Sequence, residues 1–434
     1  MAQGITQTTL DNGIVIATDH APHFNGVAIT LAFRVGSTQE PEDLCGIAHL
    51  IEHLAFRGTA QRDSQALQKA FGRLGAETNG RTDEDSTVYT ASILKDDYIA
   101  TLRVMADMVT APLFAPDDIT LEKSIIEQEN CRGCPNCSAR EALYGVAFPD
   151  QSLRHPVIGY EDTIEAITRD DIVTFHRTHY VTGNLIVSIA GDVDHDDVVA
   201  EVQAAFADLP VGAASARPTL TFAPGEISIA SGGDQASFSL LFDITSMVGT
   251  QQHKATVFYE DILGGHGFSR LMDELREKRG LVYSAWTHFE WVGQNNMLQL
   301  QVWCEARKMK EVCDVTLQTM RDVAQSLSQQ DFEDARNRCR SGLLMAADNV
   351  ERRSGDMVHD IISRGRVIES DEELAGYMAL SRDHVAAAGC ALIEQEPAIL
   401  LAGSLRAMPK FAHLRSTLRG EQVKTGPWGL LRAG

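Results

Sequence analysis

The chain has 434 residues, 44% of them hydrophobic, and this length predicts two or three domains with sizeable buried cores. Its 60 acidic and 38 basic residues give a formal net charge of −22, which would repel nucleic acids and anionic lipid head groups. The opening MAQGITQTTLDNG has neither the basic start nor the apolar run of a signal peptide, and no stretch of about 18 apolar residues could span a bilayer. We therefore expect a cytoplasmic protein that binds neither nucleic acid nor membrane.

The first predicted elements are a strand at residues 29–37 and a helix at residues 44–57, whose apolar residues recur with helical spacing. On this helix His49 and His53 are one turn apart, so their Cβ atoms lie about 5–6 Å from each other on one face, close enough to chelate one metal ion. Glu52 could reach a metal-bound water without being a ligand, which suits a general base. Two histidines on one helix are often ordinary surface residues, however, and a third ligand is missing here.

A second helix, predicted at residues 117–132, places Glu122 and Glu129 seven positions apart on one face. A catalytic zinc takes three protein ligands and keeps one open position, so Glu129 could complete the set. Acidic residues on a helix are usually solvated, and spacing alone does not bring two helices together.

Three of the eight cysteines, Cys131, Cys134 and Cys137, follow in a C-x-x-C-x-x-C pattern, where a glycine and a proline indicate a turn. Three interpretations stay open. They are reduced loop cysteines, a second structural metal with a fourth ligand such as Cys45, and a disulfide or redox role.

The chain contains a weak internal repeat. ITLAFRVGS at residues 29–37 aligns with FSLLFDITS at residues 238–246, at an offset of about 209 positions, and a helix follows each, the second at residues 252–263. The strands LIVSIAGDV (185–193) and AILLAGSL (398–405) both run into a glycine turn and have a similar offset.

Between the two copies, residues 209–225 are rich in Pro, Gly, Ala and Ser, as is typical of a linker. The sequence therefore predicts an α+β protein with two similar domains of about 210 residues each, at 1–210 and 226–434, joined by a linker at 211–225.

The chain resembles the M16 metallopeptidases, the family of pitrilysin, insulin-degrading enzyme and mitochondrial processing peptidase, over nearly its whole length. The resemblance begins with TLDNGIVIA and includes GIAHLIEHLAFRGT, which is similar to the family's inverted zinc motif His-x-x-Glu-His and its Phe-x-Gly-Thr extension. In that family a glutamate about 75 residues after the second histidine completes the zinc site, and another glutamate lies seven positions before it. Glu129 and Glu122 match these two positions.

The resemblance implies a half-length bacterial member whose two domains each pack helices on a mostly antiparallel sheet. It implies that His49, His53 and Glu129 bind one zinc ion per chain, that Glu52 is the general base and that Glu122 is a supporting acid.

Two further segments match the family. GAETNGRTDEDSTVYTASIL (75–94) looks like its active-site edge strand, where Asn79 and its neighbours would pair with the backbone of an extended peptide. FSRLMDELREKRGLVYSAW (268–286) resembles the family segment with an Arg and a Tyr seven positions apart, here Arg276 and Tyr283. By this resemblance the two side chains would bind the substrate carbonyl and stabilise the developing oxyanion.

The function implied by the resemblance is that of a zinc endopeptidase acting on short or unfolded peptides. Arg276 and Tyr283 would come from the partner in a homodimer with composite sites, and a heterodimer with an inactive paralogue is the other option. Two alternatives are a non-catalytic assembly subunit, which generally lacks zinc ligands, and an S-ribosylhomocysteine lyase, against which chain length, the repeat and Glu129 argue. The sequence leaves the physiological substrate open.

Overall fold

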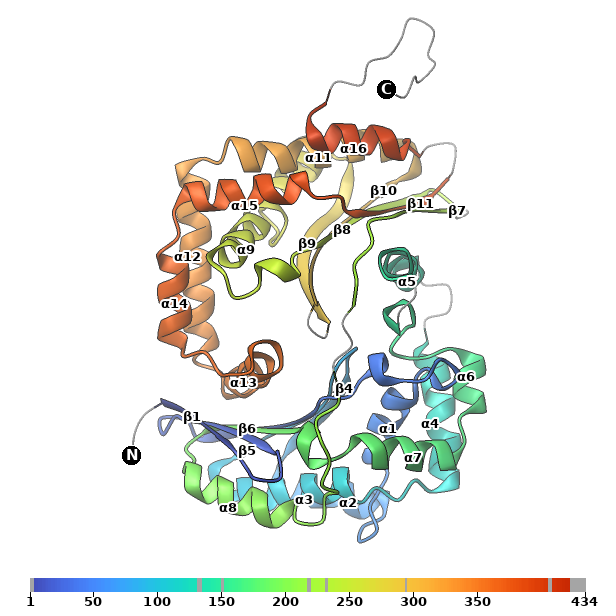
Figure 1. Ribbon diagram of the computed structural model, residues 1–434, viewed down its shortest axis with the longest axis vertical. Coiled ribbons are helices and arrows are strands. Elements are labelled where there is room, and N and C mark those ends of the chain that lie inside the picture. Colours follow the sequence, from blue (N-terminus) through green and yellow to red (C-terminus); the bar gives the residue numbers. More distant parts are fainter. Residues whose placement is uncertain are drawn as a thin grey trace, which may run out of the picture.

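Two β-sheets, each covered by helices, make up the computed structural model (Figure 1). The structure describes residues 4–130, 135–149, 152–216, 220–230, 233–292, 295–404 and 408–421. Within these residues no helix is both long enough and apolar enough to cross a membrane.

The first sheet has the strand order β1-β2-β6-β3-β5-β4, in which only β2 and β6 pair in parallel. Its strands are β1 (Gly4–Thr9), β2 (Val15–His20), β3 (Gly26–Phe33), β4 (Glu77–Thr82), β5 (Thr87–Leu94) and β6 (Leu185–Gly191). The helices of this half are α1 (Ile47–Ala55), α2 (Ser64–Leu74), α3 (Tyr98–Thr110), α4 (Pro116–Glu129), α5 (Pro135–Ala147), α6 (Glu161–Ala166), α7 (Arg169–His179) and α8 (His195–Ala205).

The second sheet has the order β7-β11-β8-β10-β9, in which only β7 and β11 pair in parallel. Its strands are β7 (Glu226–Ala230), β8 (Gln235–Asp243), β9 (Val282–Val292), β10 (Asn295–Glu305) and β11 (Ala398–Gly403). The helices here are α9 (Gln251–Leu263), α10 (Arg270–Met272), α11 (Met309–Gln325), α12 (Gln329–Ala346), α13 (Val350–Arg364), α14 (Ser370–Met378), α15 (Arg382–Glu394) and α16 (Phe411–Arg419).

The two sheets repeat one topology. When β2, β6, β3, β5 and β4 are replaced by β7, β11, β8, β10 and β9, every pairing and every direction is the same, and β1 is the one strand that the first sheet adds. The α+β fold class with two similar, mostly antiparallel halves is therefore confirmed. The internal repeat seen in the sequence corresponds to β3 with β8 and to β6 with β11.

The metal-motif helix is shorter than the sequence predicts, beginning at Ile47 instead of residue 44. The chain makes a short 3-10 turn at Glu42–Leu44, and Gly46 then adopts φ 93°, a left-handed conformation that breaks the helix. The second predicted helix also shifts, since Pro116, which cannot donate a backbone hydrogen bond and fits the first turn, begins α4 at residue 116.

Each sheet is covered on one face by a helix from the other half, as Figure 1 shows for α13 and α5. Met357, Val358 and Ile361 of α13 pack on apolar side chains of β2, β3 and β6. At the centre of this contact the buried hydroxyl of Ser354 donates a hydrogen bond to Thr30 Oγ1 at 2.8 Å. The domain boundaries at 1–210 and 226–434 stay a prediction. Helices α5 and α13 each pack on the sheet of the other half, so the halves defined by sequence do not coincide with separate packing units.

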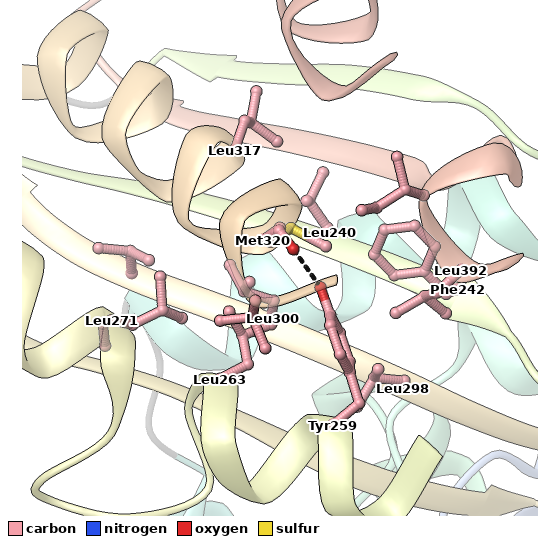
Figure 2. Close-up of a cluster of buried hydrophobic side chains, with 14 of the residues drawn as sticks. Leu240, Phe242, Tyr259, Leu263, Leu271, Leu298, Leu300, Leu317, Met320 and Leu392 are labelled. Atoms are coloured by element: carbon pink, nitrogen blue, oxygen red, sulfur yellow. Dashed lines mark hydrogen bonds between the residues drawn. The ribbon is translucent and has the colours of Figure 1, made fainter. Parts of the chain in front are cut away.

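The largest core of the second half lies between the sheet and helices α9, α11 and α15 (Figure 2). Tyr259 is fully buried in it, and its hydroxyl donates a hydrogen bond of 2.8 Å to the backbone carbonyl of Met320. This bond ties α9 to α11 inside an otherwise apolar cluster.

Replacing Tyr259 by Phe removes that bond while keeping the ring, so we expect the free energy of unfolding of the second half to fall by about 1 kcal/mol. Urea unfolding followed by tryptophan fluorescence measures it, because all four tryptophans lie after residue 285 in the sequence. Tyr377→Phe is the control, since this buried tyrosine makes no hydrogen bond through its hydroxyl within the described part of the chain. Equal losses in both variants would contradict the assignment.

Candidate metal centre

The centre is built where α1 meets α4 and β4. The apolar side chains of α1 are buried in the core of the first half, and this fixes the rotation of the helix so that His49 and His53 face α4. Glu129 is the last residue of α4 and comes to the same point.

The two histidines and Glu129 form a compact set of donors. The Nε2 atoms of His49 and His53 are 3.2 Å apart, and Glu129 Oε2 lies 3.5 Å from His53 Nε2. One ligand atom from each of the three residues lies within 4.8 Å of the others, and this is the one such cluster of three or more His, Cys, Asp or Glu side chains in the described ranges. The structure thus brings together all three residues that the sequence nominated as ligands.

Glu122 lies on α4 two helical turns before Glu129 and supports the site by contacting His53. The residue is 2% exposed, and its Oε2 accepts a hydrogen bond of 2.8 Å from His53 Nδ1. Its other oxygen, Oε1, pairs with the Arg57 guanidinium. Burial alone would raise the pKa of Glu122, but the hydrogen bonds from His53 and Arg57 hold it below its ordinary value. His53 Nδ1 is therefore engaged, and Nε2 is left to face the cluster.

The two imidazoles are in different electrostatic environments. Burial, and then the neighbouring His53, lowers the pKa of His49 to about 4, which keeps that ring neutral. Burial also opposes the charge of His53, but the hydrogen bond with Glu122 and the nearby carboxylates raise its pKa above the ordinary value. A donor set of this kind, two imidazoles and a carboxylate, is the one that a divalent transition metal prefers.

Glu52 lies beside the donors under the edge strand β4. Its side chain is 8% exposed, and burial raises its pKa to about 7. Thr82 Oγ1 approaches its Oε2 at 3.5 Å. A Cβ added to Gly80 would come within 2.8 Å of Glu52 Cδ, so only glycine lets β4 pass this close to the carboxylate.

A cavity of about 980 Å³ contains both histidines, Glu52 and Glu129, and Asn79 of β4 lines its wall. A second cavity of about 1080 Å³ shares Asn79, Glu129 and other wall residues with it and extends between the two halves to β9 and α13. Asn79 is exposed on β4, the last strand of its sheet, whose only partner among the described strands is β5.

Arg276 and Tyr283 lie together but outside this site. Arg276 is in a π-helical turn, Asp273–Glu277, and its Nη1 donates to the backbone oxygen of Tyr283 at 3.2 Å. The guanidinium carbon is 5.4 Å from the centre of the Tyr283 ring, which is 83% exposed. Neither residue lines the cavity that contains the histidines.

The cysteine pattern cannot be placed, because Cys131 and Cys134 lie outside the described residues, as does the side chain of Cys137. Cys45, the suggested fourth ligand, is buried, and this burial raises the pKa of its thiol to about 12. The three interpretations of the cysteine pattern therefore stay predictions.

The second half has no equivalent centre at the corresponding helix. At the offset of 209 positions that relates the start of β3 to the start of β8, the two histidines and the glutamate of the motif are replaced in α9 by Phe258, Ile262 and Asp261. The side chains of Phe258 and Ile262 cannot bind a metal, so of the two equivalent helices only α1 has the histidine donors.

Comparison with known proteins agrees with this division. The family model "Insulinase (Peptidase family M16)" matches residues 15–160, and "Peptidase M16 inactive domain" matches residues 166–339. A protein of Rickettsia bellii named "Uncharacterized zinc protease" is 30% identical over 374 residues, which cover 86% of this chain and 91% of the relative. The chain belongs to peptidase family M16. An "Uncharacterized zinc protease" of Streptomyces coelicolor is 27% identical over 415 residues, which cover 93% of this chain and 90% of that one.

Two crystal structures share the fold of this M16 chain. One, titled as a peptidase M16 inactive domain from Pseudomonas fluorescens, matches with a TM-score of 0.84 at 22% identity and covers 94% of this chain and 100% of its own. The other, a protease from Helicobacter pylori, matches with a TM-score of 0.82 at 18% identity, covering 92% and 100%.

Three further residues complete the site of this M16 protein and were not among the candidates predicted from the sequence. Arg57 follows the motif by four positions, a helical spacing that could have pointed to it as a partner of the same carboxylate. Gly80 and Thr82 contact Glu52 only because β4 crosses α1, and nothing in the sequence signals this crossing.

Replacing Arg57 by Ala leaves the buried Glu122 carboxylate with one partner instead of two. We expect the metal-free protein to lose about 2–3 kcal/mol of unfolding free energy. Urea unfolding followed by far-UV circular dichroism measures the loss. Arg73→Ala removes an exposed arginine from α2 in the same half and is expected to change stability by less than about 0.5 kcal/mol. A matching small loss for Arg57→Ala would show that the pair contributes little.

Proposed function

We propose that the protein is a zinc-dependent endopeptidase that cleaves short or unfolded peptides bound in extended form. The observation that carries this proposal is the convergence of His49, His53 and Glu129 within 4.8 Å, with Glu52 in the same cavity. Membership of family M16 and relatives named zinc proteases support the choice of metal and reaction. The cytoplasmic location stays a prediction of the sequence.

The donors fit one zinc ion per chain. Two imidazole nitrogens and one carboxylate oxygen are a usual protein ligand set for catalytic zinc, and three protein ligands leave a position for water or substrate. When bound, zinc supplies the Lewis acidity that acidifies water and polarises a peptide carbonyl. Glu122, which also pairs with Arg57, would hold His53 in the tautomer that leaves Nε2 available as a ligand.

Glu52 acts as the general base. A general base must lie within reach of the proton that it takes, and Glu52 lines the same cavity as the three donors. It takes the proton from the attacking water and passes it to the amine that leaves. Its placement beside His53, and not among the three donors, keeps it available for this proton transfer.

The peptide pairs with β4. Among the described strands this one ends its sheet, so its outer edge offers backbone donors and acceptors to an extended chain, and the exposed Asn79 lies on it. A peptide bound there passes Gly80, where the strand lies against Glu52. A folded protein cannot offer an unpaired backbone to this edge, which favours short or unfolded substrates.

Arg276 and Tyr283 act in trans. Within one chain they lie outside the cavity of the metal centre, yet the tyrosine ring is almost fully exposed and the arginine is held against it. In a homodimer the partner's copies of these two side chains would enter the cavity, where they would bind the substrate carbonyl and the developing oxyanion.

Glu52→Gln is expected to retain one zinc per chain and to lower kcat/KM for an unstructured peptide by at least about 100-fold, because the base is lost while the ligands remain. Metal analysis by mass spectrometry and a cleavage assay measure the two quantities. Glu127→Gln, the same change at an exposed carboxylate of α4, is the control and should leave both unchanged. Full activity of Glu52→Gln would exclude this base, and a second zinc per chain would point to the cysteine pattern.

Mixing two inactive variants tests the composite site. Glu52→Gln chains keep Arg276 and Tyr283, and Arg276→Ala chains keep Glu52. If the sites are shared, a mixed dimer regains one complete site of its two. Random exchange of equal amounts should therefore restore about a quarter of the native activity, as measured by peptide cleavage.

No restoration after verified subunit exchange, or an active monomer in size-exclusion chromatography, would contradict the shared site. An equal mixture of native and Glu52→Gln chains is the control and fixes the activity expected from dilution alone.

A further inference from the structure

Glu40 lies outside the metal motif but makes two direct contacts with the helix that carries it. Its Oε2 accepts a hydrogen bond of 2.8 Å from the backbone N–H of Gly46, and its Oε1 accepts one of 2.8 Å from Ala48. Ala48 is the second residue of α1, and His49 follows it directly. The carboxylate therefore holds the first turn of α1 at the residue before the first ligand.

This contact takes the place of an ordinary helix cap. The N-cap residue of α1 is Gly46, which has no side chain with which to bond the free N–H groups of the first turn. A larger residue is excluded there, because its Cβ would lie within 2.9 Å of Gly159 Cα and the backbone would keep its φ of 93°.

Glu40 is itself held in place by the neighbouring hairpin. Thr38, two positions before it, donates to the backbone oxygen of Glu84 from its N–H at 2.8 Å and from its hydroxyl at 2.7 Å. Glu84 lies in the turn between β4 and β5, so the segment at residues 36–40 is anchored to that turn at one end and to α1 at the other.

The two histidines differ in how their rings are oriented. His53 is fixed by its hydrogen bond to Glu122, whereas the buried Nδ1 of His49 has no hydrogen-bond partner among the residues that the structure describes. The position of the His49 donor atom therefore depends on the backbone of the first turn and on packing. That backbone is what Glu40 holds.

We propose that Glu40 is a positioning residue of the metal centre, which fixes His49 by bonding the N–H groups of Gly46 and Ala48. This inference rests on the proposed function in one respect, namely that His49 is a zinc ligand. Removing one acceptor of the pair loosens the first turn of α1 and weakens zinc binding without touching any ligand side chain.

The test compares Glu40→Gln with a matched cap in the same half. Asp194 accepts hydrogen bonds from the N–H groups of Asp196 and Asp197 at the start of α8, so Asp194→Asn makes the same chemical change at a helix with no ligand. Zinc dissociation constants are measured by competition with a chromophoric chelator, and the visible spectrum of the cobalt(II) form reports the geometry of the donors. Thermal unfolding of the metal-free proteins reports stability.

Both variants should unfold at lower temperature, but only Glu40→Gln should raise the zinc dissociation constant, by about 10-fold or more, and change the cobalt(II) bands. Glu40→Asp keeps the carboxyl group and shortens the reach, and it should weaken zinc binding to a lesser degree. If Glu40→Gln does not fold, Glu40→Asp is the deciding variant.

Native zinc affinity and a native cobalt(II) spectrum in a folded Glu40 variant would overturn the positioning role. That result is distinguishable from failure of the proposed function, because in that case the unaltered chain itself would bind no zinc, or His49→Ala would bind it as well as the native protein.

Discussion

The interaction on which the site depends is the contact of one buried carboxylate with a residue of another helix and a residue of the turn that follows that helix. Glu122 on α4 meets His53 and Arg57, which are 69 and 65 positions away in the chain. The carboxylate of a residue that is 2% exposed is stable only if it is paired, so this contact fixes how α4 lies against α1. Glu129, two helical turns further along α4, is thereby placed next to His53 Nε2. The contact of Glu122 with His53 and Arg57 therefore brings the three donors together.

The edge strand β4 forms one wall of the cavity at the centre. β4 closes one end of the first sheet, and its glycine at position 80 lets the strand lie directly over Glu52. The cavity of the donors continues past Asn79 into the space between the halves, where β9 of the second sheet forms part of the wall. The strand edge, Glu52 and the three donors therefore line cavities that share wall residues.

Within its described residues the second half has no second cluster of metal donors, and it completes the packing of the first half. Its α13 covers the first sheet, and α5 of the first half covers the second, so neither sheet buries both faces without the other half. Arg140 of α5 joins the two, since it pairs with Glu84 in the β4–β5 turn and with Glu290 on β9. Three partly buried charges of alternating sign thereby connect the strand that would bind substrate to the opposite wall of the groove.

The sequence by itself determined the fold class, the duplication and the candidate donors. Residues 29–37 and 238–246 showed the repeat because a buried strand must be apolar, and His49, Glu52 and His53 were readable together because helical spacing is local. The ends of α1 were not readable, since they depend on the backbone conformation of Gly46.

Only the tertiary structure decided that Glu129 reaches the histidines, that Gly80 lies over Glu52 and that Glu40 bonds the start of α1. It also separated Arg276 and Tyr283 from the donors of their own chain. Each of these facts is a contact between segments far apart in sequence or between a side chain and a backbone group. Such contacts depend on how whole helices and sheets pack, and the spacing of residues within one segment does not predict that packing.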